Sequence, residues 1–124
     1  MSQVAENVEG ADIVRPWLKS YPPGVPAKVD PSPYRSLADM IEQNCRKYSS
    51  RVAYDGMGKT MTFGDLETLS AKVAGWLQAQ GLKKGDRVAI MMPNVLQYPV
   101  VVSGILRAGL VVVNVNPLYT PREL

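Results

Sequence analysis

The residues that could serve as nucleophiles are limited by the absence of histidine. The 124-residue chain contains one cysteine, Cys45, and no imidazole that could deprotonate it or a serine. Ser-His-Asp and Cys-His nucleophile systems and His-based zinc sites are therefore excluded for these residues. One cysteine forms no internal disulfide, so the sequence gives no sign of an oxidising compartment. We expect Cys45 to be a small core residue.

A second candidate for chemistry is Gly58-Lys59-Thr60, which matches the end of a phosphate-binding P-loop. The P-loop pattern requires a glycine five positions earlier, where this chain has Ala53. It also requires a helix to begin at the lysine and threonine, whereas Met61-Thr62-Phe63 continues a β-prone run. We therefore reject the P-loop.

Two asparagines, Asn114 and Asn116, lie at the carboxyl end of a predicted strand, where open α/β sheets bind ligands. Asparagines before a proline also form turns, and we favour the turn. The preceding strand-to-helix turn, residues 92–97, contains no glycine, so its amides cannot approach a pyrophosphate closely. No catalytic, cofactor-binding or metal-binding residue is assigned in this chain, and any substrate-binding residues are unknown.

Composition places the chain among ordinary soluble globular proteins. It has 46% hydrophobic and 20% charged residues, with 14 Lys+Arg against 11 Asp+Glu. A chain of this length can bury roughly two-thirds of its unfolded surface, which is enough for one core. The basic residues are scattered, and only Arg46-Lys47 and Lys83-Lys84 are adjacent. A solvated surface is therefore favoured, and no nucleic-acid partner is expected.

Neither a signal peptide nor a membrane span is expected. The first twelve residues are acidic and lack a basic region followed by an apolar one. The longest apolar stretch, residues 99–115, is interrupted by Ser103, Arg107 and two glycines. It falls short of the roughly 18–20 apolar residues that a span needs, so it is expected to be a core segment.

Proline density sets apart a leader over residues 1–33. Six of the ten prolines lie between Pro16 and Pro33, which excludes helix and central strand and predicts an extended arm. The side chains of Trp17, Leu18 and Tyr21 could fix this arm to a neighbouring surface. A disordered leader that docks only in part fits the sequence equally well.

Capping residues predict two helices. Ser36 begins the first, with Asp39 at the third helical position, and Thr62 begins the second, with Asp65 in the same place. Gly81 is a natural residue to follow the end of the second helix. The first helix is expected to bury the stripe Leu37, Met40, Ile41, Cys45 and Tyr48. The second is expected to bury Leu66, Leu69, Val73, Trp76 and Leu77, with Met61 and Leu66 as a hydrophobic staple.

The remaining elements form a hairpin and a βαβ unit. Asp55-Gly56, followed by Gly58, separates two β-prone runs and predicts a hairpin. Apolar runs at residues 87–92 and 110–115 flank residues 100–106, which are apolar on nearly every face. This order predicts parallel strands with a right-handed crossover and a buried helix, with Pro99 near its first turn. The fold class is therefore α/β.

The last residues carry a helix start, with Thr120 as cap, Pro121 at the first helical position and Glu123 at the third. A helix cannot form in so few residues, and a two-stranded parallel unit leaves apolar faces uncovered. We therefore expect residues 34–124 to be the beginning of a larger domain that is cut off.

Three segments together resemble bacterial long-chain fatty-acid–CoA ligases of the adenylate-forming (AMP-binding) superfamily. Residues 62–66 are similar to the first core motif of the superfamily, and residues 106–119 to its second. VNVNPLYTPREL, residues 113–124, points to the long-chain branch, and residues 17–48 resemble the leader of that branch. The resemblance covers residues 15–124.

The resemblance implies a partial N-terminal subdomain of the adenylate-forming fold, with helices packed on a βαβ unit and a β-hairpin. The parent would activate a long-chain fatty acid with ATP and Mg²⁺ to an acyl-adenylate and transfer the acyl group to coenzyme A. The Ser/Thr/Gly-rich loop, the acidic adenine and metal motif and the C-terminal lysine of the family are not found in residues 1–124. No catalytic residue is therefore carried over, and residues 1–124 alone are expected to be inactive and to bind no cofactor.

The resemblance also bears on the partners and the cellular location of the parent enzyme. The parent would be cytoplasmic, and its fatty substrate leaves peripheral association with the inner face of the membrane open. A homodimer also stays open, with the leader around Trp17 and Tyr21 as the first place to look. Asn116 and Tyr119 lie near the motif that leads toward the substrate cleft, and no contact is assigned to them. Two alternative functions remain, namely a ligase for an aryl or shorter-chain acid and a stand-alone non-catalytic α/β interaction module.

Overall fold

The structure is a computed structural model that describes residues 15–124. Its contacts divide the chain into two units, Met1–Pro31 and Ser32–Leu124, and each is described by itself. The first 14 residues of the predicted leader lie outside the described part. That residues 34–124 begin a larger domain stays a prediction.

The first unit contains a short 3-10 helix, η1 (Pro16–Ser20), closed by hydrogen bonds from the Leu18 N–H to the Arg15 carbonyl and from the Tyr21 N–H to the Leu18 carbonyl, both 3.2 Å. The prediction that proline density excludes any helix is therefore wrong for these five residues. Pro16 occupies the first helical position, where no N–H is needed and its fixed φ is suitable. The role of Trp17, Leu18 and Tyr21 in fixing the leader stays a prediction.

Helix α1 (Leu37–Lys47) begins where the sequence predicts. The Ser36 hydroxyl accepts from the Asp39 N–H at 3.1 Å, and the Asp39 carboxylate reaches back to the Arg35 N–H at 3.0 Å. Cys45 is buried, whereas Leu37 is exposed, so Leu37 does not belong to the predicted buried stripe. Its place in the first turn puts it beyond the edge of the packed face.

The predicted hairpin is confirmed, as β1 (Val52–Gly56) and β2 (Lys59–Thr62) pair in antiparallel fashion. Its turn residues are Met57 and Gly58, with φ angles of 55° and 72°, a pair of left-handed residues typical of a type I′ turn. Asp55-Gly56 lies in β1 rather than in the turn. Lys59 and Thr60 lie in β2, so the structure supports the rejection of the P-loop.

Helix α2 (Phe63–Ala79) has the predicted capping box, since the Thr62 hydroxyl accepts from the Asp65 N–H at 3.0 Å and the Asp65 carboxylate accepts from the Thr62 N–H at 2.9 Å. Gly81 follows its end with a φ of 83°. Leu69 and Trp76 are exposed, against prediction. The buried face is rotated toward small residues and consists of Leu66, Ser70, Ala74 and Leu77.

The βαβ unit is confirmed as β3 (Arg87–Ile90), α3 (Gln97–Arg107) and β4 (Val111–Asn114), with both strands shorter than predicted. The strands are parallel, with Arg87 opposite Val111 and Ile90 opposite Asn114. Pro99 is the third residue of α3, in the first turn, where helical N–H groups have no partner within the helix.

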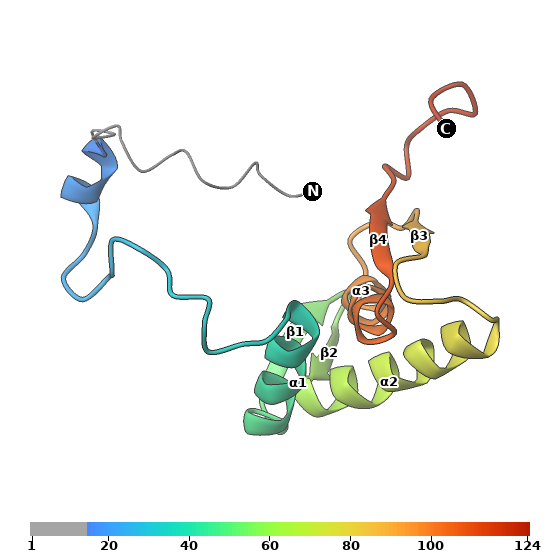
Figure 1. The fold of residues 1–124 in the computed structure, drawn as a ribbon, viewed down its shortest axis with the longest axis horizontal. Coiled ribbons are helices and arrows are strands. Elements are labelled where there is room, and N and C mark those ends of the chain that lie inside the picture. Colours follow the sequence, from blue (N-terminus) through green and yellow to red (C-terminus); the bar gives the residue numbers. More distant parts are fainter. Residues whose placement is uncertain (1–14) are drawn as a thin grey trace, which may run out of the picture. The chain divides into compact units, whose positions relative to one another are not determined.

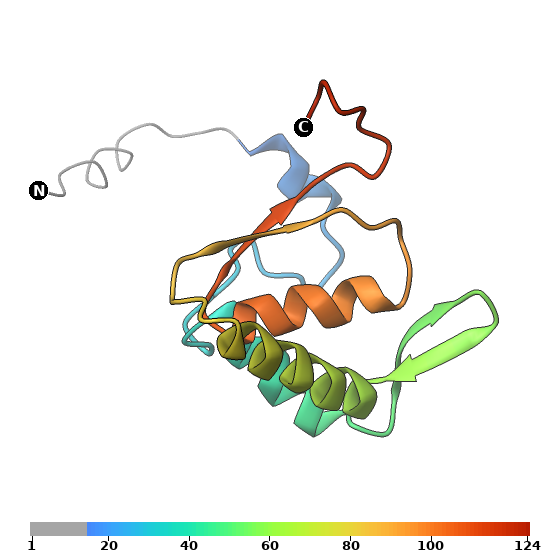
Figure 2. The same cartoon turned by 90° about the vertical axis from the view of Figure 1, so that its right-hand side faces the viewer.

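Helix α3 lies between the β3–β4 pair and α1, and the hairpin extends away from the helices (Figures 1 and 2). Two apolar clusters hold this arrangement together. One contains Cys45, Met61, Leu66 and Val100, so both members of the predicted staple are in it. The other contains Leu77, Ile90, Ile105 and Leu110, and Val73 packs against both clusters.

Residues Pro121–Glu123 form a single turn rather than a helix. The Glu123 carboxylate accepts from the Thr120 N–H at 2.8 Å and from its hydroxyl at 2.7 Å. These hydrogen bonds lower the pKa of Glu123. The residues thus make the local contacts of a helix start.

Candidate functional site

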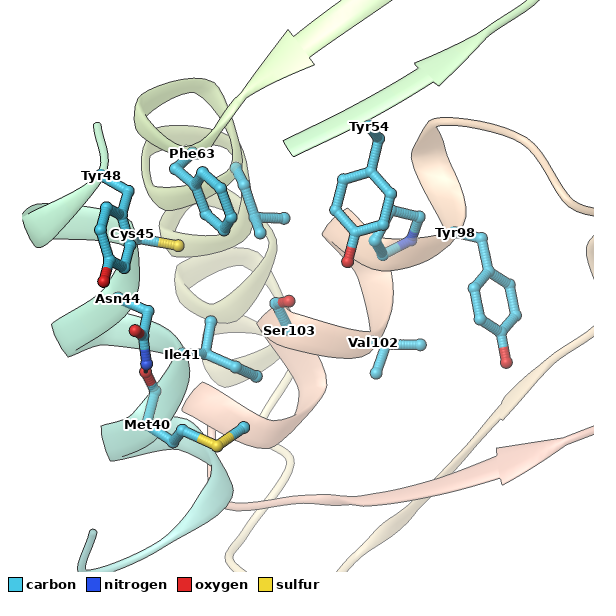
Figure 3. A pocket seen from close by; sticks show the side chains of 12 residues that line it. Met40, Ile41, Asn44, Cys45, Tyr48, Tyr54, Phe63, Tyr98, Val102 and Ser103 are labelled. Atoms are coloured by element: carbon cyan, nitrogen blue, oxygen red, sulfur yellow. Dashed lines mark hydrogen bonds between the residues drawn. The ribbon is translucent and has the colours of Figure 1, made fainter. Parts of the chain in front are cut away.

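The second unit contains an open apolar cavity of about 550 Å³. Side chains of α1 form one wall and residues of α3 another, with Tyr54 of β1 and Phe63 of α2 above them (Figure 3). Its lining residues are Met40, Ile41, Asn44, Cys45, Tyr48, Tyr54, Phe63, Leu66, Tyr98, Pro99, Val102 and Ser103.

No charged side chain lines this cavity. Among its polar groups, the Asn44 side-chain amide is already engaged, because it donates to the Met40 carbonyl at 2.8 Å and to the Tyr34 hydroxyl at 3.4 Å. A phosphate or carboxylate placed here would lose its hydration without gaining a cation. The cavity therefore suits an apolar group and not the charged part of a nucleotide.

Cys45 lies on the wall of the cavity with an exposed fraction of 1%. Burial raises the pKa of its thiol, and the nearby Glu67 carboxylate acts in the same direction. A raised pKa keeps the sulfur in the thiol form, which is a poor nucleophile. The expectation that Cys45 is a core residue is confirmed.

Next to this core, four charged residues join the three helices, and we call them the ion cluster: Glu42 and Arg46 of α1, Glu67 of α2 and Arg107 of α3. Arg107 Nη1 donates to Glu67 Oε2 at 2.8 Å and Arg107 Nη2 to Glu67 Oε1 at 3.2 Å, a bidentate pair. Arg107 Nε lies 3.4 Å from Glu42 Oε1, and Arg46 lies 3.6 Å from Glu42 and 3.8 Å from Glu67.

Arg107 is the centre of the ion cluster. It also donates to the Ser70 hydroxyl at 3.2 Å and to the Glu67 carbonyl at 3.3 Å, and its side chain is 12% exposed. The hydrogen bonds to Glu67 raise the pKa of Arg107, so the guanidinium stays charged. All these partners are side chains or carbonyls of the same unit, and the arrangement positions helices rather than a reacting group.

Sequence reasoning missed the ion cluster. Arg107 was visible only as an interruption of an apolar stretch, and its partner Glu67 lies 40 residues earlier. A usable signal was the charged residue at the end of an otherwise apolar helix, since such a residue needs a partner when buried. The sequence does not say which carboxylate supplies it.

The two asparagines behave differently. Asn116 forms a turn, as favoured, because its side-chain oxygen accepts from the Leu118 N–H at 3.0 Å and its carbonyl from the Tyr119 N–H at 3.0 Å. Asn114 does not form a turn. It is the last residue of β4, and its Oδ1 accepts from the Tyr98 hydroxyl at 2.7 Å, which ties the strand end to the first turn of α3.

Neither a cluster of metal ligands nor a glycine-rich loop before α3 is found in residues 15–124. Within this range there is no group of three or more His, Cys, Asp or Glu residues that could hold a metal ion. The loop before α3 has no glycine, and α3 itself has no side-chain cap. In the same range, no helix is both long enough and apolar enough to pass through a bilayer.

Similarity to known proteins covers most of the chain. The family model described as AMP-binding enzyme matches residues 41–124. A long-chain-fatty-acid–CoA ligase of Escherichia coli O157:H7 is 59% identical over 109 residues, which is 87% of this chain and 19% of that ligase. The chain therefore spans about a fifth of the length of the curated relatives it matches.

The structural neighbours are adenylate-forming enzymes. The NpsA N-terminal subdomain of Klebsiella oxytoca, in complex with 3-hydroxyanthranilyl-AMSN, aligns with a TM-score of 0.68 at 25% identity, over 70% of this chain and 22% of that one. A benzoate CoA ligase from Burkholderia xenovorans LB400 aligns with a TM-score of 0.65 at 28% identity, over 68% of this chain and 17% of that one. The predicted fold, part of an N-terminal adenylate-forming subdomain, is confirmed.

Proposed function

Because this chain belongs to the AMP-binding enzyme family, we propose that it works within a long-chain fatty-acid–CoA ligase. The reaction joins a long-chain fatty acid to ATP, forming an acyl-adenylate and pyrophosphate, and then transfers the acyl group to coenzyme A with release of AMP. Mg²⁺ would accompany the ATP.

The observation that carries this proposal is a difference in similarity. The chain is 59% identical to the E. coli long-chain ligase but only 28% identical to the benzoate ligase. An aryl-acid ligase would be expected to resemble the second more closely than the first. The comparison therefore supports a long-chain acid over an aryl acid.

We assign residues 34–124 a scaffolding role in that reaction. The ion cluster fixes the three helices to one another, and α3 carries the β3–β4 pair. No described residue is assigned to ATP or coenzyme A, because the cavity has no charged side chain that could pair with their phosphates. The groups that bind these substrates would lie in other parts of the polypeptide.

Two finer features belong to the same proposal. The polypeptide would be cytoplasmic, with peripheral association at the inner face of the membrane where its substrate is found. It would form a homodimer in which the leader takes part, with Trp17 and Tyr21 exposed for contact. Removal of residues 1–33 followed by a mass measurement in solution tests the dimer, and an unchanged dimer would exclude the leader as the contact.

The substrate class is tested with the full product of the native gene. Release of AMP is measured with ATP, Mg²⁺ and coenzyme A against hexadecanoate, butanoate and benzoate at equal concentrations. The proposal expects the highest kcat/KM with hexadecanoate. A preference for benzoate or butanoate would establish the alternative ligase, and no acid-dependent AMP release with any of them would favour a non-catalytic module.

A further inference from the structure

The β3–β4 pair has two unequal faces. Residues Val88, Ile90, Met92, Leu110 and Val112 pack into the apolar cluster beneath the strands, together with residues of α2 and α3. The alternate residues point the other way and are exposed. We call them the outer sheet face: Arg87, Ala89, Met91, Val111 and Val113.

Four of the five side chains of the outer sheet face are apolar, and the fifth, Arg87, lies opposite Val111 at the amino end of β3. Val111, Val113 and Met91 are 44%, 37% and 43% exposed, and Ala89 lies opposite Val113 in the register. Antiparallel sheets usually carry polar residues on a face that meets water. The outer sheet face instead has the composition of an interior surface.

Strand direction strengthens this conclusion. Parallel sheets occur almost only where both faces are covered, because the crossover connections place helices on them. Here α3 covers one face of the β3–β4 pair (Figure 2). The sheet has only these two strands, so each also presents an unpaired edge within the described residues.

We propose that the outer sheet face is an internal interface, covered by apolar side chains from a part of the same polypeptide outside these 124 residues. The length of the relatives supports this occupant, because about four-fifths of each lies outside the matched region. The covering layer must be largely apolar, because past Arg87, at the amino end of β3, the face presents only Ala89, Met91, Val111 and Val113.

The experiment compares one substitution in two contexts. Val113→Lys places a charge on the outer sheet face, and Thr60→Lys places the same charge on an exposed position of β2. Each is made in the full product of the native gene and in residues 1–124, and Tm is measured. The readout is stability, so it does not depend on ligase activity.

In the full product, we expect Val113→Lys to lower Tm by roughly 5 °C or more, because a buried lysine lacks a partner. Thr60→Lys should leave Tm within about 2 °C. In residues 1–124, both variants should behave like Thr60→Lys. Loss of folding of the full product in Val113→Lys but not in Thr60→Lys would also support the proposal. The milder Val113→Thr would then be expected to fold with a measurably lower Tm.

Several results would overturn the proposal. Equal tolerance of Val113→Lys in both contexts would mean that the face meets water, and equal loss in both would mean that these 124 residues bury it themselves. A native gene product that ends at Leu124 would leave no covering segment. A dimer of residues 1–124 that Val113→Lys dissociates would show that a second copy is the occupant.

Discussion

Gly104 of α3 lies so close to Val73 of α2 that a Cβ added to the glycine would be 2.6 Å from the Val73 Cβ and Cγ1. The same added atom would lie 3.1 Å from the Ser70 carbonyl oxygen. The two helix backbones therefore approach at this point, which only a glycine permits. Arg107 lies three residues later in α3. Because the two helices are close here, its guanidinium donates to the backbone carbonyl of Glu67 at 3.3 Å.

Gly104→Ala is expected to destabilise the chain by about 1–3 kcal/mol, because the methyl group forces the helices apart. Gly75→Ala is the matched control, since a Cβ there meets nothing within 4 Å and alanine favours helix, so a gain of about 0.5–1 kcal/mol is expected. Urea unfolding followed by circular dichroism measures both. The added variant Val73→Ala should recover part of the loss in Gly104→Ala. Equal free energies of unfolding for the two glycine variants would contradict the close approach.

Arg107→Met keeps most of the apolar stem but removes the guanidinium, so Glu42 and Glu67 lose the nearer of the two cations that they share. We expect a loss of about 2 kcal/mol, because both partners of the main pair are largely buried. Arg46→Met should change stability by less than about 0.5 kcal/mol, because Arg46 is 69% exposed and its contacts are long. Replacing Glu67 with glutamine in Arg107→Met should restore part of the loss. A larger loss of stability in Arg46→Met than in Arg107→Met would contradict the central role of Arg107 in the ion cluster.

The hydrogen bonds that cap α1 should make the stability of the chain depend on pH. Hydrogen bonds from the Arg35 side chain, the Arg35 N–H and the Gln43 side chain lower the pKa of Asp39 from 3.8 to about 2. Because the pKa of Asp39 is lower in the folded chain than in the unfolded chain, its carboxylate stabilises the fold at pH values above the unfolded pKa of 3.8. This stabilisation is lost as the pH falls from there through the folded pKa of about 2. Asp39→Asn keeps an acceptor oxygen but no titrating group.

Tm measured from pH 5 to pH 2 should therefore fall less steeply in Asp39→Asn than in the unchanged chain, with the difference developing below about pH 4. Asp55→Asn, in the exposed part of the hairpin, controls for the loss of one carboxylate. Parallel curves for the unchanged chain and Asp39→Asn would contradict the role of this cap.

The hairpin turn offers a stabilising change. Met57 adopts a φ of 55°, which a long side chain disfavours and asparagine tolerates. Met57→Asn should therefore raise the free energy of unfolding by about 0.5–1 kcal/mol. Gly58→Ala should lower it although a Cβ there meets nothing within 4 Å, because its φ is 72°. A stabilising effect of Gly58→Ala would contradict the turn geometry.

Local features were predictable from the sequence because they depend on residues a few positions apart. The caps at Ser36 and Thr62 are such features, and so is the glycine at position 81. The order of strand, helix and strand was also predictable from apolar runs with glycine and proline at their ends.

The errors within α2 have one physical cause. Leu69 and Trp76 fit the apolar period of α2, yet Ser70 and Ala74 are buried, because the face of α2 that meets α3 is set by the close approach of Gly104 to Val73 and Ser70. Ser70 is tolerated inside because its hydroxyl accepts from Arg107. Periodicity finds the face of a helix but cannot locate a crossing point made by a residue some 30 positions away. The partners in the ion cluster are hidden from sequence for the same reason.

The central claim, that this chain is a scaffold within an acid-activating ligase, is tested most directly by ATP–pyrophosphate exchange. Exchange of labelled pyrophosphate into ATP is measured with hexadecanoate for residues 1–124 and for the full product of the native gene. We predict fatty-acid-dependent exchange by the full product and none by residues 1–124. Robust exchange by residues 1–124 alone, or none by the full product, would contradict the account.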